Sequence, residues 1–185
     1  MKRCGWAIGD SMLMEYHDKE WGVPIHNDTK LFEFLILEGA QAGLNWLTIL
    51  KKRENYRTAF DHFDPSKIAK YSHKHVKRLL ANPGIIRNSL KIKATITNAQ
   101  KFVQIQTDFG SFDSYVWRFT QGKPVNHKFR SLSAIPAKSR ESDTLSRDLR
   151  GRGFKFVGST ISYAFMQAVG IVNDHVVDCF RHDQV

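Results

Sequence analysis

Apolar residues recur at helical spacing along most of this chain and predict a fold built from helices. On the clearest of these helices, which Asp28 is expected to cap, four residues share one face: Leu31, Phe34, Leu35 and Glu38. Asn45 is expected to cap a second helix that continues to about residue 60, and Asp64 followed by Pro65 marks another helix start. Further helices are expected at about 72–81, 88–105, 112–119 and 141–150, and from residue 159 or 160 onward. Strand-like alternation is scarce and residues 121–137 are expected to form a loop, so the predicted fold class is all-α.

The length and composition are those of a globular domain. With 185 residues, 42% of them hydrophobic and 25% charged, the chain is long enough for one core and too apolar for intrinsic disorder. We expect a single domain spanning residues 1–185. No stretch near the start resembles a signal peptide, and the longest apolar run, residues 34–37, is too short to cross a bilayer. The expected location is therefore cytoplasmic, in a bacterial cytosol, without a membrane partner.

The positive charge of the chain is concentrated in its middle. The formal net charge is +10, and residues 51–101 alone carry 13 basic and 3 acidic residues, whereas the remainder of the chain balances to zero. A local excess of this size favours a polyanionic partner that docks on one region. Nucleic acid is the first candidate, ahead of an anionic membrane surface.

A proline–glycine turn lies inside this basic stretch. Pro83 and Gly84 separate two predicted helices within residues 72–105, and the element resembles a helix-hairpin-helix, whose backbone amides bind a DNA phosphate. The match is partial, because Ile86 stands where the usual second glycine would be. The cations around the turn are Lys74, Lys77, Arg78, Arg87, Lys91 and Lys93. A DNA contact through Pro83, Gly84 and Arg87 is favoured over the alternative, an ordinary helical hairpin with a solvated basic face.

Glu38 is a carboxylate in the middle of an apolar helix face, whereas Lys30 and Glu33 are expected to lie off that face. A buried, unpaired carboxylate is costly, so the residue needs hydrogen-bond donors or a raised pKa. One interpretation is a pocket carboxylate that accepts hydrogen bonds from a flat, cationic ligand stacked on nearby aromatic rings. The alternative is a helix that stops at Gly39, so that the carboxylate reaches solvent.

Two cysteines and two histidines near opposite ends of the chain could form a metal site. His175 and Cys179 are spaced i, i+4, which would place them on one side of a helical turn, and Cys4 and His17 lie near the start of the chain. Two cysteines and two histidines are a complete tetrahedral zinc set with no open position for water. The alternative is a pair of buried free cysteines with core or surface histidines. The remaining histidines, His182 among them, are expected at the surface.

Several runs of sequence, taken together, resemble the 3-methyladenine DNA glycosylase I family along essentially the whole chain. These runs are Arg3–Trp6, Tyr16–Asp18, Glu20–Pro24, Leu37–Gly39, Gln41–Leu44, Leu50–Tyr56, Arg152–Gly158 and Gly170–His175. The resemblance implies a helix-hairpin-helix glycosylase fold in two helical lobes with the pocket between them. It also implies a structural zinc ion that ties the two termini together through Cys4, His17, His175 and Cys179.

The resemblance further implies how the site is divided among residues. Trp6, Tyr16 and Trp46 would line the pocket for a flipped base, and Glu38 would be the catalytic residue that binds its edge. Leu44, directly after Gly43, would wedge into the gap in the DNA. Trp21 and Trp117 are expected in the core. One departure from the family is Leu13, where a tyrosine is usual, so the aromatic lining of the pocket is expected to be thinner on that side.

The function implied is hydrolytic release of 3-methyladenine from alkylated double-stranded DNA by a monomer, leaving an abasic site and the free base. No lysine stands in the place that Schiff-base lyase chemistry would need, so a monofunctional enzyme is expected. The first alternative is a zinc-stabilised DNA-binding module without catalysis, which would have no reason to bury Glu38. A second is a protein that modifies or binds RNA through the same basic surface.

Overall fold

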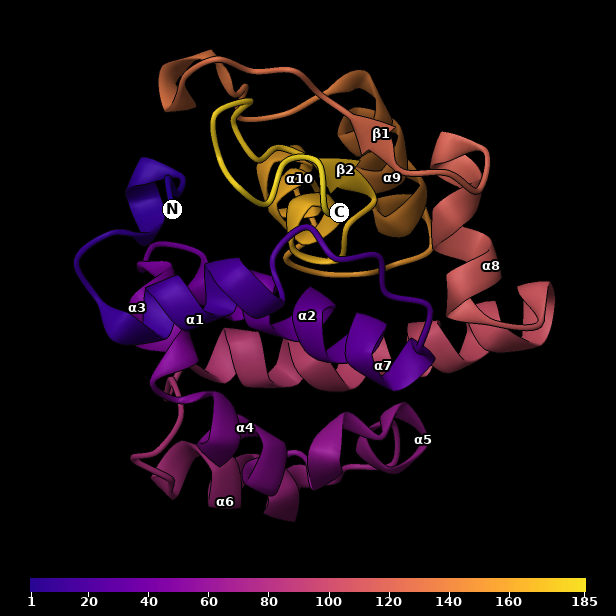
Figure 1. Ribbon diagram of the computed structural model, residues 1–185. Helices are drawn as coiled ribbons and strands as arrows, with labels where there is room; N and C mark the ends of the chain where they lie inside the picture. Colours follow the sequence, from indigo (N-terminus) through magenta and orange to yellow (C-terminus); the bar gives the residue numbers. More distant parts are fainter.

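Two helices, α2 and α7, run through the middle of the molecule, and the remaining elements lie on either side of them in the computed structural model, which describes residues 1–185 (Figure 1). The α-helices are α1 (Ser11–Lys19), α2 (Asp28–Gln41), α3 (Trp46–Leu50), α4 (Arg53–Ala59), α5 (Pro65–Ile68), α6 (His73–Ala81), α7 (Ser89–Phe109), α8 (Phe112–Trp117), α9 (Arg140–Gly151) and α10 (Ser159–Ala168). Short 3-10 turns are η1 (Gly5–Ala7), η2 (Asp61–Phe63), η3 (Arg118–Thr120) and η4 (Leu132–Ala134). In Figure 1, α4, α5 and α6 lie at the bottom of the view, and α9, α10 and both chain ends lie above α2.

Helix α2 is the central core helix. Ten consecutive residues, Leu31–Ala40, are buried, because neighbours cover the helix on every side. Its cap differs from the prediction: the side chain of Asn27 accepts from the backbone of Lys30, at 3.0 Å, and Asp28 begins the helix. The Asp28 carboxylate instead accepts from the backbone N–H of Phe112 and of Asp113, at 2.9 and 2.8 Å, and so joins α2 to the start of α8.

The helix expected to start at Asn45 begins there but divides in two. Asn45 accepts from the backbone of Thr48 at 2.8 Å, which confirms the predicted cap. The helix then turns at Lys51 and Lys52, and α4 follows in a new direction. The Lys52 ammonium donates to the carbonyl of Pro83 at 3.0 Å, which ties this turn to the α6–α7 hairpin.

The predicted helices at 72–81, 88–105, 112–119 and 141–150 are present as α6, α7, α8 and α9. Helix α7 runs longer than expected, to Phe109, and α10 has only 10 residues and starts after Gly158 rather than at a Ser159 or Thr160 cap. Helix α1, capped by Asp10, was not predicted. No helix of the structure has the length and apolarity needed to span a membrane.

The fold is mostly helical, with one small exception to the all-α prediction. Strands β1 (Val125–Asn126) and β2 (Val172–Asn173) form a short parallel pair, which joins the expected loop at 121–137 to the C-terminal segment. That segment ends in turns and contains no α-helix, so His175 and Cys179 do not share a helical turn as predicted. The buried apolar residues form one contiguous cluster, and the interpretation of residues 1–185 as a single domain stays a prediction.

Candidate functional site

An open cavity of about 390 Å³ lies where α1, α2, α3 and α10 meet the loop before α9. Its size is within the range of cavities that bind small ligands in proteins. Most of its wall is aromatic or aliphatic, with few polar groups. The lining residues are Trp6, Tyr16, Trp21, Glu38, Gln41, Trp46, Leu132, Ile135, Pro136, Ala164 and Gln167.

Glu38 is the one ionisable carboxylate of this wall. Helix α2 continues past Gly39 to Gln41, so Glu38 stays on a helical turn and is only 5% exposed, and the interpretation of a carboxylate that reaches solvent is wrong. No protein group within hydrogen-bonding distance pairs with it, and burial alone raises the pKa of its carboxyl group to about 8. Without a ligand the carboxyl group is therefore mostly protonated at neutral pH, and a cationic ligand would favour its ionised form.

Four aromatic side chains line the cavity together with Glu38: those of Trp6, Tyr16, Trp21 and Trp46. The ring centroids of Tyr16 and Trp46 lie 5.3 Å apart, and those of Trp6 and Trp21 lie 5.0 Å apart with the rings edge to face. Burial raises the pKa of the Tyr16 hydroxyl well above its usual value, with the nearby Glu38 carboxylate as a second cause. Trp21 and Trp117 are both buried in the core as predicted, and Trp21 also lines the cavity.

A smaller hollow of about 180 Å³ continues from the cavity past the end of α2. It shares Glu38 and Gln41 with the cavity and is bordered by Gly43 and Leu44. Gly43 has φ 77°, in the left-handed region, which lets the chain turn sharply between α2 and α3. The turn leaves Leu44 42% exposed at the tip, beside the opening. Leu13, by contrast, is half-buried and is not a lining residue.

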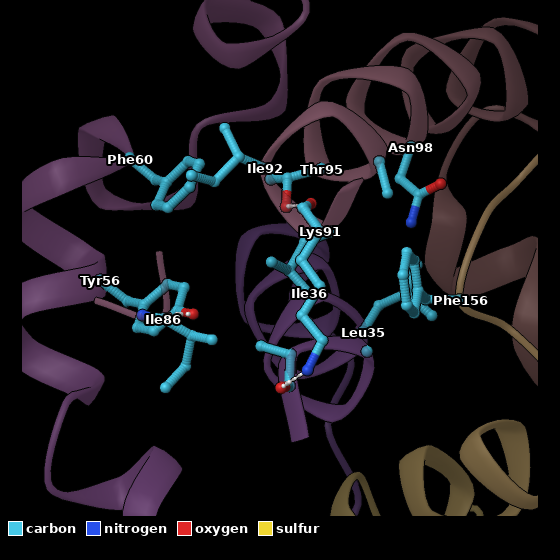
Figure 2. Close-up of a pocket in the computed structure, with 13 residues that line it drawn as sticks. Leu35, Ile36, Tyr56, Phe60, Ile86, Lys91, Ile92, Thr95, Asn98 and Phe156 are labelled. Carbon is cyan, nitrogen blue, oxygen red and sulfur yellow. Dashed lines mark hydrogen bonds between the residues drawn. The ribbon is translucent and has the colours of Figure 1, made fainter. Parts of the chain in front are cut away.

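The far side of α2 is held by a lysine from α7. The Lys91 ammonium donates to the carbonyl of Ala40 and to that of Ala42, at 2.7 Å each, where α2 ends (Figure 2). A cation at a helix C-terminus compensates the unpaired carbonyls and the helix dipole. Lys91 is therefore turned into the structure, unlike the DNA-facing cation that the sequence suggested, and burial lowers the pKa of its ammonium group.

The α6–α7 turn is tightly made. The backbone N–H of Gly84 donates to the Asn82 side chain at 2.8 Å, and that of Ile86 donates to the Tyr56 hydroxyl at 3.2 Å. Pro83 and Arg87 are exposed on the turn. Arg78 donates to the Ala59 carbonyl at 3.1 Å, so only some of the cations expected around the hairpin are free of intramolecular contacts.

The predicted Cys and His residues meet in one buried cluster. One ligand atom from each of Cys4, His17, His175 and Cys179 lies within 4.8 Å of all the others. The Cys179 sulfur is 3.4 Å from His17 Nε2 and 3.5 Å from His175 Nδ1, and the Cys4 sulfur is 3.7 Å from His175 Nδ1. Metal–ligand bonds of tetrahedral zinc would separate sulfur and nitrogen ligands by about 3.6 Å. The donor set and its spacing fit a zinc ion.

The outer contacts of the two imidazoles also fit metal ligands. His17 Nδ1 lies 2.8 Å from the Asp18 carboxylate, and His175 Nε2 lies 3.0 Å from the carbonyl of Trp21, so each ring presents its other nitrogen to the cluster. Burial lowers the pKa of both imidazoles, that of His175 to about 4, which keeps them neutral at physiological pH. His182, expected at the surface, is also buried in this region.

The cluster stands directly behind the aromatic wall of the cavity. The rings of Trp21 and His175 have centroids 4.5 Å apart, and those of Trp6 and His17 are 5.5 Å apart, both edge to face. The cavity and the Cys–His cluster are therefore packed against each other, and the N-terminal segment supplies residues to both.

Comparison with known proteins places this chain in a family. The sequence model described as methyladenine glycosylase matches residues 6–182. The DNA-3-methyladenine glycosylase 1 of Escherichia coli is 51% identical over 179 residues, which cover 97% of this chain and 96% of the relative. The chain belongs to the methyladenine glycosylase family.

Solved members of the methyladenine glycosylase family share this fold. A crystal structure of 3-methyladenine DNA glycosylase I superimposes with a TM-score of 0.94 at 50% identity, over 97% of this chain and 98% of the other. The 3-methyladenine DNA glycosylase I of Staphylococcus aureus, solved for the structural basis of 3-methyladenine recognition, gives a TM-score of 0.94 at 36% identity, over 97% and 96%. The predicted family is confirmed.

Sequence reasoning missed part of this methyladenine glycosylase cavity. It named Trp6, Tyr16, Glu38 and Trp46, and the structure brings all four into one wall. It did not name Gln167 or the three residues from the loop before α9, Leu132, Ile135 and Pro136. No periodicity marks that loop, so only the fold could show that it reaches the cavity. Trp21 follows His17 by four residues, and this short separation from a named site residue could have indicated that Trp21 lies near the cavity.

Proposed function

We propose that this protein is a DNA repair enzyme that releases 3-methyladenine from alkylated double-stranded DNA by hydrolysis. The observation that carries the proposal is Glu38, a buried and unpaired carboxyl group in an aromatic cavity of base-binding size. The relative that was solved for recognition of 3-methyladenine has the same fold. A non-catalytic DNA-binding module, the first alternative, would gain nothing from such a group.

Recognition of the damaged base follows from charge and shape. Methylation at N3 makes adenine cationic within DNA, so ionised Glu38 would attract it and accept hydrogen bonds from its edge. Tyr16, Trp46 and Trp6 would stack on its faces. Neutral adenine gains less from a carboxylate, which supplies discrimination between damaged and normal bases without a tight steric fit.

The hydrolysis needs little acid catalysis, because the cationic base leaves as a neutral molecule when the bond from its N9 to the sugar C1′ breaks. The electron pair of that bond neutralises the base, and the sugar becomes an oxocarbenium-like cation. Water adds its oxygen to C1′ and gives a proton to solvent, which leaves an abasic site. Glu38 is the one catalytic residue we assign, and its part is to hold the base in the extruded position while its negative charge faces the reacting region.

Extrusion of the base requires contacts to the DNA outside the cavity. We infer that exposed Leu44, held out by the turn at Gly43, enters the gap left by the flipped nucleotide. The α6–α7 hairpin, as a helix-hairpin-helix element with exposed Pro83 and Arg87 beside Gly84, would hold a phosphate near the lesion.

We further infer that Cys4, His17, His175 and Cys179 hold a structural zinc ion. Bound there, the ion would fasten the two ends of the chain and support the cavity wall through the rings of Trp6 and Trp21. Purified protein should contain one zinc per chain, and Cys179→Ser should lose it together with several kcal/mol of stability. A metal-free protein whose folded cysteines react freely with an alkylating agent would refute this assignment.

We expect the enzyme to be monofunctional and to act as a monomer. A lyase needs an amine close to the sugar C1′ to form a Schiff base, and the cavity lining contains no lysine. With borohydride present, no covalent protein–DNA adduct should therefore be trapped.

The test is an incubation of the purified protein with duplex DNA methylated by an alkylating agent, with released bases separated by chromatography. The expected result is free 3-methyladenine, with strands that break only after alkali treatment. Absence of 3-methyladenine would overturn the proposed function, and faster release from methylated RNA would favour the RNA alternative instead.

A further inference from the structure

The loop before α9 carries a second basic surface that the charge count of the whole chain conceals. Residues 121–139, called the rim loop here, contain four basic residues and no acidic one: Lys123, Lys128, Arg130 and Lys138. All four are exposed, and none forms an ion pair with a carboxylate. Protein surfaces usually mix both signs, so a one-sign stretch of this length favours an anionic partner.

The same loop forms one wall of the base cavity. Leu132, Ile135 and Pro136 line the cavity, and Leu132 is 39% exposed at its edge. Arg130 precedes Leu132 by two residues and Lys138 follows Pro136 by two, so each cation lies within about 7 Å of chain length from a lining residue. A base that enters the cavity brings the phosphates on both sides of its sugar to the cavity opening, and this loop is part of the cavity wall.

The rim loop is built into the fold and does not hang free. The backbone of His127 donates to Asn173 at 3.1 Å, and that of Val177 donates to Phe129 at 2.9 Å, which fastens the start of the loop beside the Cys–His cluster. The buried Asp174 carboxylate lies 2.6 Å from His127 Nδ1. At the tip, a Cβ on Gly5 would come within 3.2 Å of Leu132, so the loop packs closely on η1. Because the backbone of the loop is already ordered, only the side chains of its cations lose conformational freedom when they meet a phosphate.

The rim loop and the hairpin lie on different sides of the cavity. In Figure 1 the chain between β1 and α9 runs along the top of the view, α6 lies at the bottom, and α3 lies between them. Leu44 lies two residues before the start of α3. This places Leu44, the residue proposed to enter the gap in the DNA, between the rim loop and the α6–α7 hairpin.

We propose that the rim loop is a second DNA-binding surface, in which Lys128, Arg130 and Lys138 contact phosphates beside the flipped nucleotide, on the side of the cavity away from the hairpin. The inference rests on the proposed function, since it requires a nucleotide in the cavity. Phosphate binding would then be shared between the rim loop and the α6–α7 hairpin, so that the DNA is bound on both sides of the lesion while the base is flipped out.

The test compares two triple variants that remove the same charge. The first is K128A/R130A/K138A in the rim loop, and the control is K30A/R147A/R150A, which removes exposed cations of α2 and α9 that form no ion pair. Dissociation constants are measured for duplex DNA with a stable abasic analogue over a series of salt concentrations. Binding of free 3-methyladenine is measured in parallel, and thermal unfolding verifies that both variants are folded.

The rim variant is expected to bind the duplex about tenfold more weakly at low salt, and the slope of log affinity against log salt should fall by about 2 to 3. Its affinity for free 3-methyladenine should not change, and K128R/R130K/K138R should restore binding, because the charge is what matters. Equal affinity and equal slope in the rim and control variants would overturn the inference. Failure of the wild type to release 3-methyladenine would instead overturn the proposed function, and the salt slopes would still decide whether the rim loop binds DNA.

Discussion

Helix α2 buries two carboxylates five residues apart, and their surroundings are opposite. Glu33 has 7% of its side chain exposed and lies 2.6 Å from Arg53 Nε and 2.8 Å from Arg57 Nη2. Glu38 is buried to the same degree, has no cationic partner, and faces the aromatic cavity. One helix therefore holds a paired buried charge toward α4 and an unpaired buried carboxyl group toward the cavity.

The comparison separates structural from functional burial. Arg53 also reaches Glu20 at 2.8 Å, so the Glu33 region is an ion-pair network that joins α2 and α4 to the residue that follows α1. The Glu33 carboxylate is paired within the protein by this network and does not need a ligand to compensate its charge. The Glu38 carboxyl group is satisfied only when a ligand enters, and a cost of this kind is typical of functional sites.

The largest expected effect is a loss of folding stability when Glu33, and not Glu38, is substituted. Glu33→Gln leaves two arginines without their shared partner, so we expect a loss of about 3 to 5 kcal/mol in the free energy of unfolding, measured with urea. Base release per folded molecule should stay close to that of the wild type. The matched control is Glu54→Gln, an exposed partner of Arg57, which should change stability by less than about 1 kcal/mol. Equal effects of the two substitutions would break the structural interpretation of Glu33.

Glu38→Gln should have the opposite profile. The variant keeps the shape of the side chain and loses the negative charge, so the rate of 3-methyladenine release should fall roughly ten- to a hundredfold, which corresponds to about 1.4 to 2.7 kcal/mol. Affinity for undamaged duplex DNA, and its salt dependence, should be unchanged. A variant with wild-type release of 3-methyladenine would show that Glu38 takes no part in recognition or catalysis.

The pH dependence of stability tests whether Glu38 is truly unpaired. Its carboxyl group keeps a proton in the native state up to about pH 8, whereas the unfolded chain releases it around the ordinary value of 4.5. Between these values the native state binds more protons, so the stability of the wild type falls as pH rises. Glu38→Gln has no such loss, and its advantage should grow by about 2 kcal/mol between about pH 5.5 and 7.5. Parallel stability curves would contradict the unpaired state.

The smallest expected effect concerns Lys91, which holds the end of α2 next to Glu38. Lys91→Met removes two hydrogen bonds to the end of α2, and we expect a loss of about 1 kcal/mol in stability. Release of 3-methyladenine should fall slightly more than stability alone explains, because the turn at Gly43 loses its anchor. Lys93→Met, on the exposed face of the same helix, is the control and should be close to neutral.

Some of this contrast was predictable from the sequence. Helical spacing identified Glu38 as a carboxylate on an apolar face, and the structure keeps it buried there. The same spacing placed Glu33 off that apolar face and did not predict its burial, because the arginines that bury it come from α4, a separate helix after Lys51 and Lys52. Periodicity describes one helix at a time and contains no information on which partner covers its other faces.

The metal cluster and the rim loop show the same limit. Two cysteines and two histidines suggested a zinc set, but the i, i+4 argument for His175 and Cys179 was wrong, since turns and not a helix bring them together. The rim loop has no pattern that indicates its position. It reaches the cavity because β1 pairs with β2 and because the Phe129 carbonyl accepts from the backbone of Val177, contacts between residues 47 and 48 positions apart.

The central claim is that Glu38 is an uncharged carboxyl group in the free protein and ionises against a cationic base. Its pKa can be measured directly by carbon NMR of protein with labelled glutamate, with Glu38→Gln used to assign the signal. The probe is 3,9-dimethyladenine, a permanent cation whose N9 methyl group stands for the sugar. We predict a pKa of about 8 in the free protein and a value well below that in the complex. An ordinary pKa near 4.5 in the free protein, or a pKa that the cation leaves unchanged, would contradict the account.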